Sequence, residues 1–143
     1  MDLRIEEREK EGIRILDLQG NLLIGDSESL LRNTLFGGAE QGRVNAILNF
    51  AGVREIDDDG LGTLLVCHAR FRRAGGGLKL LTLSRVHMEL FIFMKLEGVF
   101  EVYQNEEDAI DSFFPDRAVH SFDILKFVEE HSKRPSSTTE KKP

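Results

Sequence analysis

Apolar and polar residues alternate at the start of the chain, first over 3–7 and again over 12–18. Alternation with a period of two is typical of a β-strand that buries one face. The charged segment 9–12 lies between the two runs, so the pattern predicts a β-hairpin. Gly20-Asn21 is expected to end its second strand.

A helical period follows, because apolar residues now recur three and four positions apart. Asp26 or Ser27 is the expected N-terminal cap of this helix, and Gly37 and Gly38 are expected to end it. The recurring face consists of Leu30, Leu31, Thr34 and Leu35.

Strands and helices alternate in the rest of the pattern. The mostly apolar run 44–50 suits a central strand covered on both faces. Two further strands are predicted at 78–83 and 99–103, and three further helices at 61–73, from Ser84 to about Leu96, and at 105–114, where Asn105 is the expected cap.

The element order β-β-α-β-α-β-α-β-α predicts an α/β fold. Helices that separate successive strands give a mixed, mostly parallel sheet with right-handed crossovers. A chain of 143 residues is long enough for one domain with a core, which we assign to 1–115.

The chain continues beyond that domain. Residues 116–131 are predicted to hold an extra C-terminal helix, and 132–143, which are basic and rich in Ser and Thr, a disordered tail. Five of the seven residues 122–128 are apolar, a face too broad for a simple surface helix. We therefore expect this helix either to pack back on the domain or to dock on another chain, for example in a homodimer.

Composition narrows the class of partner. Hydrophobic residues make up 41% of the chain and charged residues 31%, as in ordinary soluble domains. A formal net charge of −6 argues against nucleic acid or an anionic membrane surface, so the expected partner is a protein or a small molecule. The charged N-terminus, the lack of a long apolar run and the single Cys67 predict a cytoplasmic protein without disulfides or membrane insertion.

The most unusual stretch is REIDDDGLGTLL, residues 54–65, in which three adjacent carboxylates precede a predicted helix. Such neighbours repel by roughly 1–3 kcal/mol per pair at about 6 Å. A helix start offsets part of this cost, since its free amides and dipole favour an anion by roughly 0.3–1 kcal/mol and a cap adds about 1 kcal/mol. The simplest interpretation is that Asp58 and Asp59 cap the helix.

A longer segment around these acids carries a family resemblance. LNFAGVREIDDDGLGTLL, 48–65, is similar to the strand, Gly-Val turn and Ile/Met-Asp-Ser-Ser/Thr-Gly-Leu-Gly helix start of the STAS domain, the fold of bacterial anti-sigma factor antagonists. RRAGGGLKLLTLS, 72–84, and LEGVFEVYQNEEDAI, 96–110, resemble later parts of the same fold. The resemblance covers Leu3 to about Phe114.

The resemblance implies a partner-switching function without catalysis or a cofactor in the domain itself. In such families the antagonist binds a kinase-like anti-sigma factor, which releases its sigma factor. This serine kinase then phosphorylates the antagonist and ends the complex, because a phosphate adds a charge of about −1.5 to −2 to the docking surface.

Matched by position, Asp57 corresponds to the family's Asp, Asp58 to its first Ser and Asp59 to its phosphoacceptor. Because Asp59 has no hydroxyl to phosphorylate, the switch is expected to be fixed or moved elsewhere. Two further departures are Leu23 and Asn49, where many members carry an acid. The expected partner-binding surface comprises Asp57, Asp58, Asp59, Gly60, Leu61 and Gly62, with Asn21, Asp26 and Ser27 beside them.

Alternatives remain at this stage. Some STAS proteins that resemble this one are structural subunits of lipid-transporting ABC ATPases. A metal or aspartyl-phosphate site would need a lysine, but neither Lys79 nor Lys95 belongs to a recognisable arrangement, and the histidines lack metal-ligand spacing.

Thr63 is either a substitute phosphoacceptor or a surface helix residue. Gly75–Gly77 follow a helix, which is wrong for a phosphate-cradling loop, and Arg70, Arg72 and Arg73 are expected to form a solvated helix end that an acidic partner could use.

Overall fold

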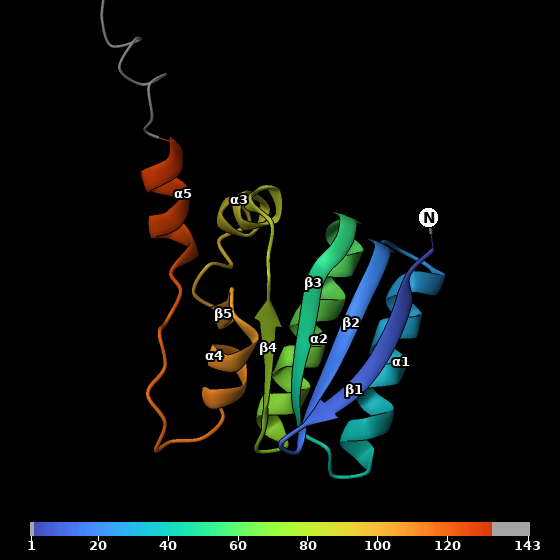
Figure 1. Ribbon diagram of the computed structural model, residues 1–143. Coiled ribbons are helices and arrows are strands. Elements are labelled where there is room, and N and C mark those ends of the chain that lie inside the picture. The colour runs from blue at the N-terminus through green and yellow to red at the C-terminus, as the bar shows by residue number, and fades with distance from the viewer. Residues whose placement is uncertain (1, 133–143) are drawn as a thin grey trace, which may run out of the picture.

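A computed structural model describes residues 2–132 of the chain (Figure 1). The strands form one five-stranded sheet in the order β1-β2-β3-β4-β5, in which β1 is antiparallel to β2 and all other neighbours are parallel. The predicted α/β class, element order and mostly parallel sheet are confirmed. The strands are β1 (Arg4–Lys10), β2 (Ile13–Leu22), β3 (Asn45–Ile56), β4 (Gly77–Leu81) and β5 (Val102–Tyr103).

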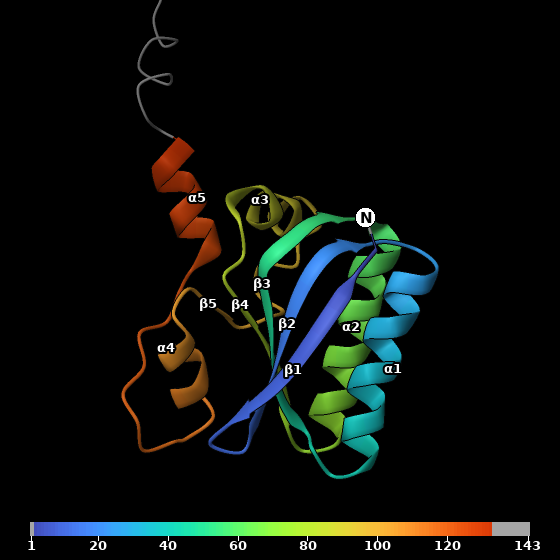
Figure 2. The same ribbon diagram turned by 45° about the vertical axis from the view of Figure 1, so that its right-hand side comes forward.

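The helices divide between the two faces of the sheet (Figures 1 and 2). Leu31 of α1, Leu64 of α2 and Met88 of α3 belong to the larger buried cluster on one face, whereas Ile110 of α4 belongs to a smaller cluster on the other. The helices are α1 (Asp26–Glu40), α2 (Asp58–Arg73), α3 (Arg85–Phe93), α4 (Glu106–Asp111) and α5 (Ile124–Ser132).

The predicted end of β2 at Gly20-Asn21 is wrong, since the strand continues to Leu22. Gly20 has a φ of 105°, and a Cβ there would lie 2.2 Å from the carbonyl oxygen of Asp2. The glycine therefore permits a close approach of the N-terminal segment without stopping the strand.

The predicted ends of α1 are also wrong. Neither Asp26 nor Ser27 caps it: the residue before the helix is Gly25, and the Ser27 hydroxyl instead accepts from the Leu23 amide at 2.8 Å and donates to the Leu23 carbonyl at 2.7 Å. Nor does the helix end at the glycine pair, because it continues to Glu40.

A buried arginine explains why α1 carries a glycine in its interior. The Arg14 side chain is 2% exposed, and its guanidinium donates to the backbone carbonyls of Thr34 and Leu35 and pairs with Glu7 at 2.7 Å. A Cβ at Gly38 would lie 2.2 Å from the guanidinium. Gly38 therefore makes room for Arg14, and the helix keeps its geometry.

Several elements are shorter than predicted: β4 ends at Leu81 and α4 at Asp111, whereas the pattern predicts 83 and 114. β5 contains only two residues. α3 begins after its predicted cap, Ser84, whose hydroxyl accepts from the His87 amide, but it ends at Phe93 because Lys95 adopts a left-handed conformation with a φ of 62°. The Leu96 amide then bonds back to the Phe91 carbonyl, as in a Schellman ending.

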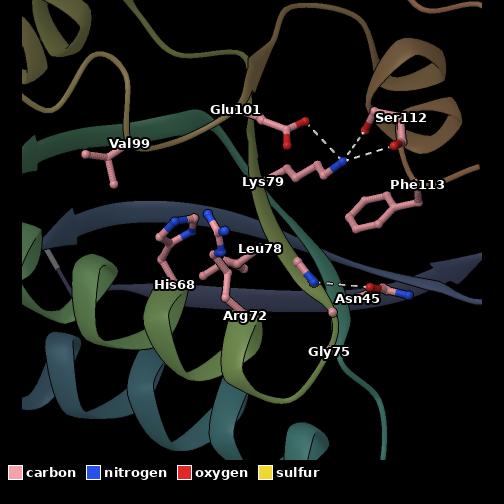
Figure 3. Close-up of a pocket in the computed structure, with 12 residues that line it drawn as sticks. Asn45, His68, Arg72, Gly75, Leu78, Lys79, Val99, Glu101, Ser112 and Phe113 are labelled. Atoms are coloured by element: carbon pink, nitrogen blue, oxygen red, sulfur yellow. Dashed lines mark hydrogen bonds and ion pairs between the residues drawn. The ribbon is translucent and has the colours of Figure 1, made fainter. Parts of the chain in front are cut away.

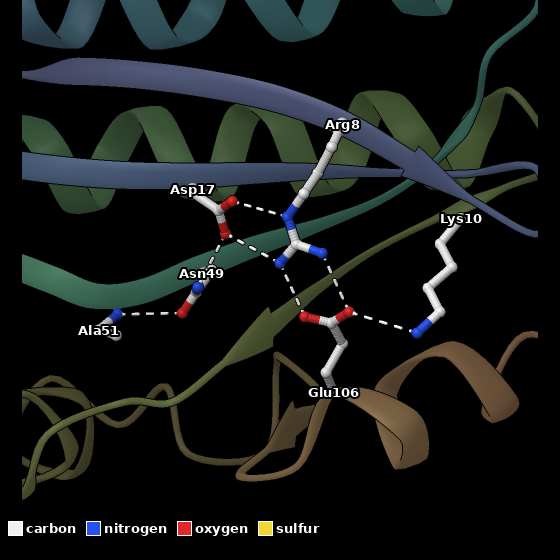
Figure 4. A network of polar contacts seen from close by, with 6 residues as sticks. All are labelled: Arg8, Lys10, Asp17, Asn49, Ala51 and Glu106. Carbon is white, nitrogen blue, oxygen red and sulfur yellow. Dashed lines mark hydrogen bonds and ion pairs between the residues drawn. The ribbon is translucent and has the colours of Figure 1, made fainter.

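A polar network connects the β1-β2 hairpin to α4, on the face of the sheet that carries the smaller buried cluster (Figure 4). Arg8 pairs with Asp17 at 2.7 Å and with Glu106 at 2.7 Å, and the Asn49 amide donates to Asp17 at 2.8 Å. The Arg8 hydrogen bond lowers the pKa of Asp17 despite its partial burial, with help from Asn49. A carboxylate at position 49 would repel Asp17, which accounts locally for the amide there.

The segment after α4 returns to the domain. Phe122, Phe127 and Val128 pack against the larger buried cluster, and Ile124 is part of it. Phe122 also forms an antiparallel bridge with Val102 of β5. Within residues 2–132 four of the five apolar residues of this segment thus lie against the chain's own core, and Leu125 remains exposed. The predicted tail, 132–143, lies outside the described residues except for Ser132, where α5 ends.

Candidate functional site

The acidic triplet lies where β3 ends and α2 begins, and its first member is the helix cap. Asp57 has an extended backbone, and its Oδ1 accepts from the Gly60 amide at 2.8 Å while its Oδ2 accepts from the Ile24 amide at 2.9 Å. The interpretation that Asp58 and Asp59 cap the helix is therefore wrong. Desolvation opposes ionisation of Asp57, but hydrogen bonds from backbone amides, led by those of Ile24 and Gly60, together outweigh it and lower the pKa of this carboxyl.

This cap places the other two acids in the first turn of α2, where both are exposed. The helix dipole favours their charge there. Both carboxylate oxygens of Asp57 accept hydrogen bonds from backbone amides, so this acid has a structural role. Asp58 and Asp59 are surface acids.

A shallow depression of about 470 Å³ lies beside these two acids, between α1 and α2. Ile24 is 68% exposed and Val66 54% exposed at its edge, so apolar surface adjoins the carboxylates. The lining consists of Ile24, Glu28, Arg32, Asp58, Asp59, Gly62, Thr63 and Val66.

Sequence reasoning missed four of these lining residues: Ile24, Glu28, Arg32 and Val66. Two signals were present in the sequence. Glu28 and Arg32 have the i,i+4 spacing of a helical ion pair, which they form. Ile24 is an apolar residue directly before a turn glycine.

Thr63 is not the surface residue expected from the sequence. It is 6% exposed, and its hydroxyl donates to Glu28 Oε1. This hydrogen bond is the main reason that the pKa of Glu28 is lowered. Burial and this bond argue against Thr63 as a substitute phosphoacceptor.

The predicted residues before α1 shape the neighbouring loop. Asn21 Oδ1 accepts from the Glu55 amide at 3.2 Å and so joins the ends of β2 and β3. Ser27 fixes the loop through both backbone groups of Leu23. Asp26 is exposed in the first turn of α1. The bond from Ile24 to Asp57 then holds this loop against the start of α2.

The predicted residues Gly60 and Leu61 face inward, whereas Gly62 faces the depression. Leu61 is 2% exposed and belongs to the larger buried cluster. A Cβ at Gly60 would lie 2.4 Å from the Leu22 carbonyl oxygen, but a Cβ at Gly62 would meet nothing within 4 Å. The first two therefore position the helix start, and Gly62 belongs to its free surface.

This difference predicts opposite effects of one substitution at neighbouring positions. Gly60→Ala is expected to lower the free energy of unfolding by about 2 kcal/mol, because the methyl group meets backbone that cannot move independently. Gly62→Ala should raise it by about 0.5–1 kcal/mol, because alanine loses less entropy in a helix. Urea denaturation followed by circular dichroism measures both, and equal effects at the two positions would contradict this packing.

Neither a metal centre nor a membrane span is found among residues 2–132. No group of three or more His, Cys, Asp or Glu in this range could hold a metal ion. Lys79, considered above for an aspartyl-phosphate site, pairs instead with Glu101 at 3.1 Å. No helix in the same range has the length and apolar character needed to cross a bilayer.

Comparison with known proteins identifies relatives at the level of family and fold. The STAS domain family matches residues 4–109. No curated protein matches the sequence.

Three solved structures share the fold. A Thermotoga maritima protein whose role as an anti-sigma factor antagonist is itself only proposed is 17% identical, covering 76% of this chain and 93% of its own, with a TM-score of 0.72. The Bacillus cell fate determinant SpoIIAA in its phosphorylated form is 23% identical, covering 76% and 98%, with a TM-score of 0.61. A sulfate transporter family protein from Wolinella succinogenes is 16% identical, covering 72% and 85%, with a TM-score of 0.58.

Proposed function

Because this chain belongs to the STAS domain family, we propose that it is a regulatory binding protein of the anti-sigma factor antagonist type. Its partner is a kinase-like anti-sigma factor in a partner-switching pathway. The docking surface is the exposed side of the depression between α1 and α2, formed by Ile24, Asp58, Asp59, Gly62 and Val66.

The observation that carries this proposal is the position of Asp59. It corresponds to the phosphoacceptor in the family motif, and it is exposed on the first turn of α2 beside the exposed side chains of Ile24 and Val66. Protein interfaces typically have an apolar centre with a polar rim, and apolar and acidic groups adjoin in this way around the depression.

We also propose that regulation of this chain differs from that of relatives that carry a hydroxyl at the position of Asp59. A phosphorylated hydroxyl carries a charge of about −1.5 to −2 that can be added and removed, whereas Asp59 carries at most one negative charge that a kinase cannot change. The buried hydroxyl of Thr63 offers no replacement in the next turn. We therefore propose a switch that is locked at this site.

The docking surface is tested by a matched pair of substitutions. Val66→Glu is expected to weaken binding of the purified anti-sigma factor at least about tenfold, since it adds charge to the apolar part of the interface. Leu125→Glu, the same change in charge at another exposed apolar residue on α5, should leave affinity unchanged. Isothermal titration calorimetry measures both.

Two outcomes would contradict the proposed function. The first is equal affinity for the wild type and Val66→Glu. The second is that the wild type binds an ABC-type ATPase and no anti-sigma factor, which would favour the structural-subunit interpretation.

A further inference from the structure

A separate pocket lies at the opposite end of the sheet from Asp59, where β3 and β4 begin and α2 ends (Figure 3). Its volume is about 480 Å³, within the range of small-molecule sites. His68 and Arg72 extend into it from α2, Lys79 from β4, and Phe113 from the segment after α4.

The pocket exists because β5 is short. On the side of β4 that faces β5, the Leu80 amide donates to the Glu101 carbonyl. On the side that faces β3, the Gly77 amide donates to the Val44 carbonyl. Because successive amides of a strand point to alternate neighbours, the Leu78 amide also points toward the β5 side. β5 begins only at Val102, so this amide faces the pocket that Leu78 lines.

The neighbouring glycine amides are already used. The Gly75 amide bonds to the Arg72 carbonyl and the Gly76 amide to the Phe71 carbonyl, which together form a Schellman ending of α2. The loop therefore closes one end of the pocket, and donors for a ligand must come from side chains and from the edge of β4.

The charge of the pocket is positive in a chain whose formal net charge is −6. Lys79 is paired with Glu101 at 3.1 Å, and its ammonium also donates to the Ser112 hydroxyl at 2.9 Å and lies 4.2 Å from the centre of the Phe113 ring. Within residues 2–132 the Arg72 guanidinium makes no ion pair. The charges of Lys79 and Glu101 therefore cancel, and the net positive charge of the pocket is that of Arg72.

A second polar group in the pocket also lacks a partner. His68 Nδ1 is buried and has no hydrogen-bond partner among the described residues, and the ring lies 4.9 Å from that of Phe100. Burial lowers the pKa of His68 and the charge of Arg72 lowers it further, although the backbone of Leu78 and the charge of Glu101 oppose both. The arrangement thus places an imidazole with a lowered pKa beside a guanidinium that has no ion pair among the described residues.

We propose that this pocket binds a small organic phosphate monoester. The planar guanidinium of Arg72 pairs with two phosphate oxygens, a geometry that favours arginine at phosphate sites. The Leu78 amide offers a further hydrogen bond, and the His68 ring lies beside the bound group. The organic part lies against the apolar wall of Leu78, Val99 and Phe113, because the volume exceeds what a phosphate ion alone fills.

Adjacent arginines provide a matched test. Arg72 and Arg73 are both exposed at the end of α2, but only Arg72 lines the pocket. Phenyl phosphate, inorganic phosphate and benzoate are titrated at constant ionic strength into the wild type, Arg72→Gln and Arg73→Gln, and amide shifts are followed by NMR. Phenyl phosphate should bind most tightly and shift the Leu78 amide, and Arg72→Gln should weaken it at least about tenfold. Arg73→Gln should bind like the wild type.

The ring of His68 supplies an independent readout. A bound phosphate near this ring should raise the pKa of His68 in the wild type and in Arg73→Gln, but not in Arg72→Gln. The proposal is overturned if phenyl phosphate does not saturate, if both variants lose affinity equally, or if benzoate binds as tightly. The proposed function at Asp59 is unaffected by any of these results, since it concerns the other end of α2.

Discussion

Glu7→Gln is expected to lower the free energy of unfolding by about 3 kcal/mol, the largest stability effect that the structure predicts for one polar substitution. Glu7 holds Arg14 by two hydrogen bonds, at 2.7 Å from Nε and 3.1 Å from Nη2. Arg14 is 2% exposed, so a neutral amide at position 7 leaves its charge buried without a carboxylate beside it. Removing one partner of a buried ion pair costs much more than the pair itself contributes.

The control lies two residues away on the same strand. Glu9 pairs with Arg43 at 3.1 Å, but the two side chains are 55% and 41% exposed. Glu9→Gln should therefore change stability by no more than about 0.5 kcal/mol. Urea denaturation compares the two variants, and a similar loss in both would contradict the role assigned to Arg14.

At acidic pH the difference in free energy of unfolding between the wild type and Glu7→Gln should disappear. The hydrogen bond from Arg14 lowers the pKa of Glu7, although burial opposes this. A carboxyl whose pKa is lower in the folded state stabilises fully above its unfolded pKa, and this contribution is lost as the pH falls through the folded pKa. The two stability curves should therefore converge below about pH 4. If the difference in free energy of unfolding between the two proteins stays constant down to about pH 2, the ion pair between Glu7 and Arg14 does not account for it.

The glycines show most clearly which part of the fold was not predictable from the sequence. Alternation and helical periods identified the strands and helices, because burial of one face leaves a local pattern. The local pattern predicts Gly20 and Gly38 as ends of elements, yet each makes room for a distant group, the carbonyl of Asp2 and the guanidinium of Arg14. Such approaches depend on tertiary packing and leave no local pattern.

The candidate site divides in the same way. The position of the acidic triplet at a helix start was predicted from the sequence, but the cap is Asp57. The depression arises only when α1 lies beside α2, which brings Glu28 to Thr63 across 35 positions of the chain. One signal could have indicated the burial of Thr63, since it lies four residues before the buried Cys67 on the same face of α2.

Asp59→Ser is expected to give the largest functional change, because under the proposed function it places a hydroxyl at the position that we propose corresponds to the phosphoacceptor of the family motif. The residue is exposed, so the substitution leaves the buried core and the Asp57 cap intact. Phosphate added there carries about −1.5 to −2 charges and should release the partner. The wild type should instead bind its anti-sigma factor equally with and without ATP.

Asp58→Ser is the matched control for this change. It replaces a neighbouring exposed carboxylate of the same helical turn by the same hydroxyl. A kinase that recognises position 59 specifically should not modify this variant, whereas one that accepts any hydroxyl at the start of α2 should modify both.

The most direct test of the proposed locked switch is mass spectrometry after incubation of wild type, Asp59→Ser and Asp58→Ser with the purified anti-sigma kinase and ATP. The account predicts a phosphate at position 59 in Asp59→Ser and none in the other two proteins. A phosphate on Asp59 or Thr63 of the wild type, or no phosphate on Asp59→Ser, would contradict it.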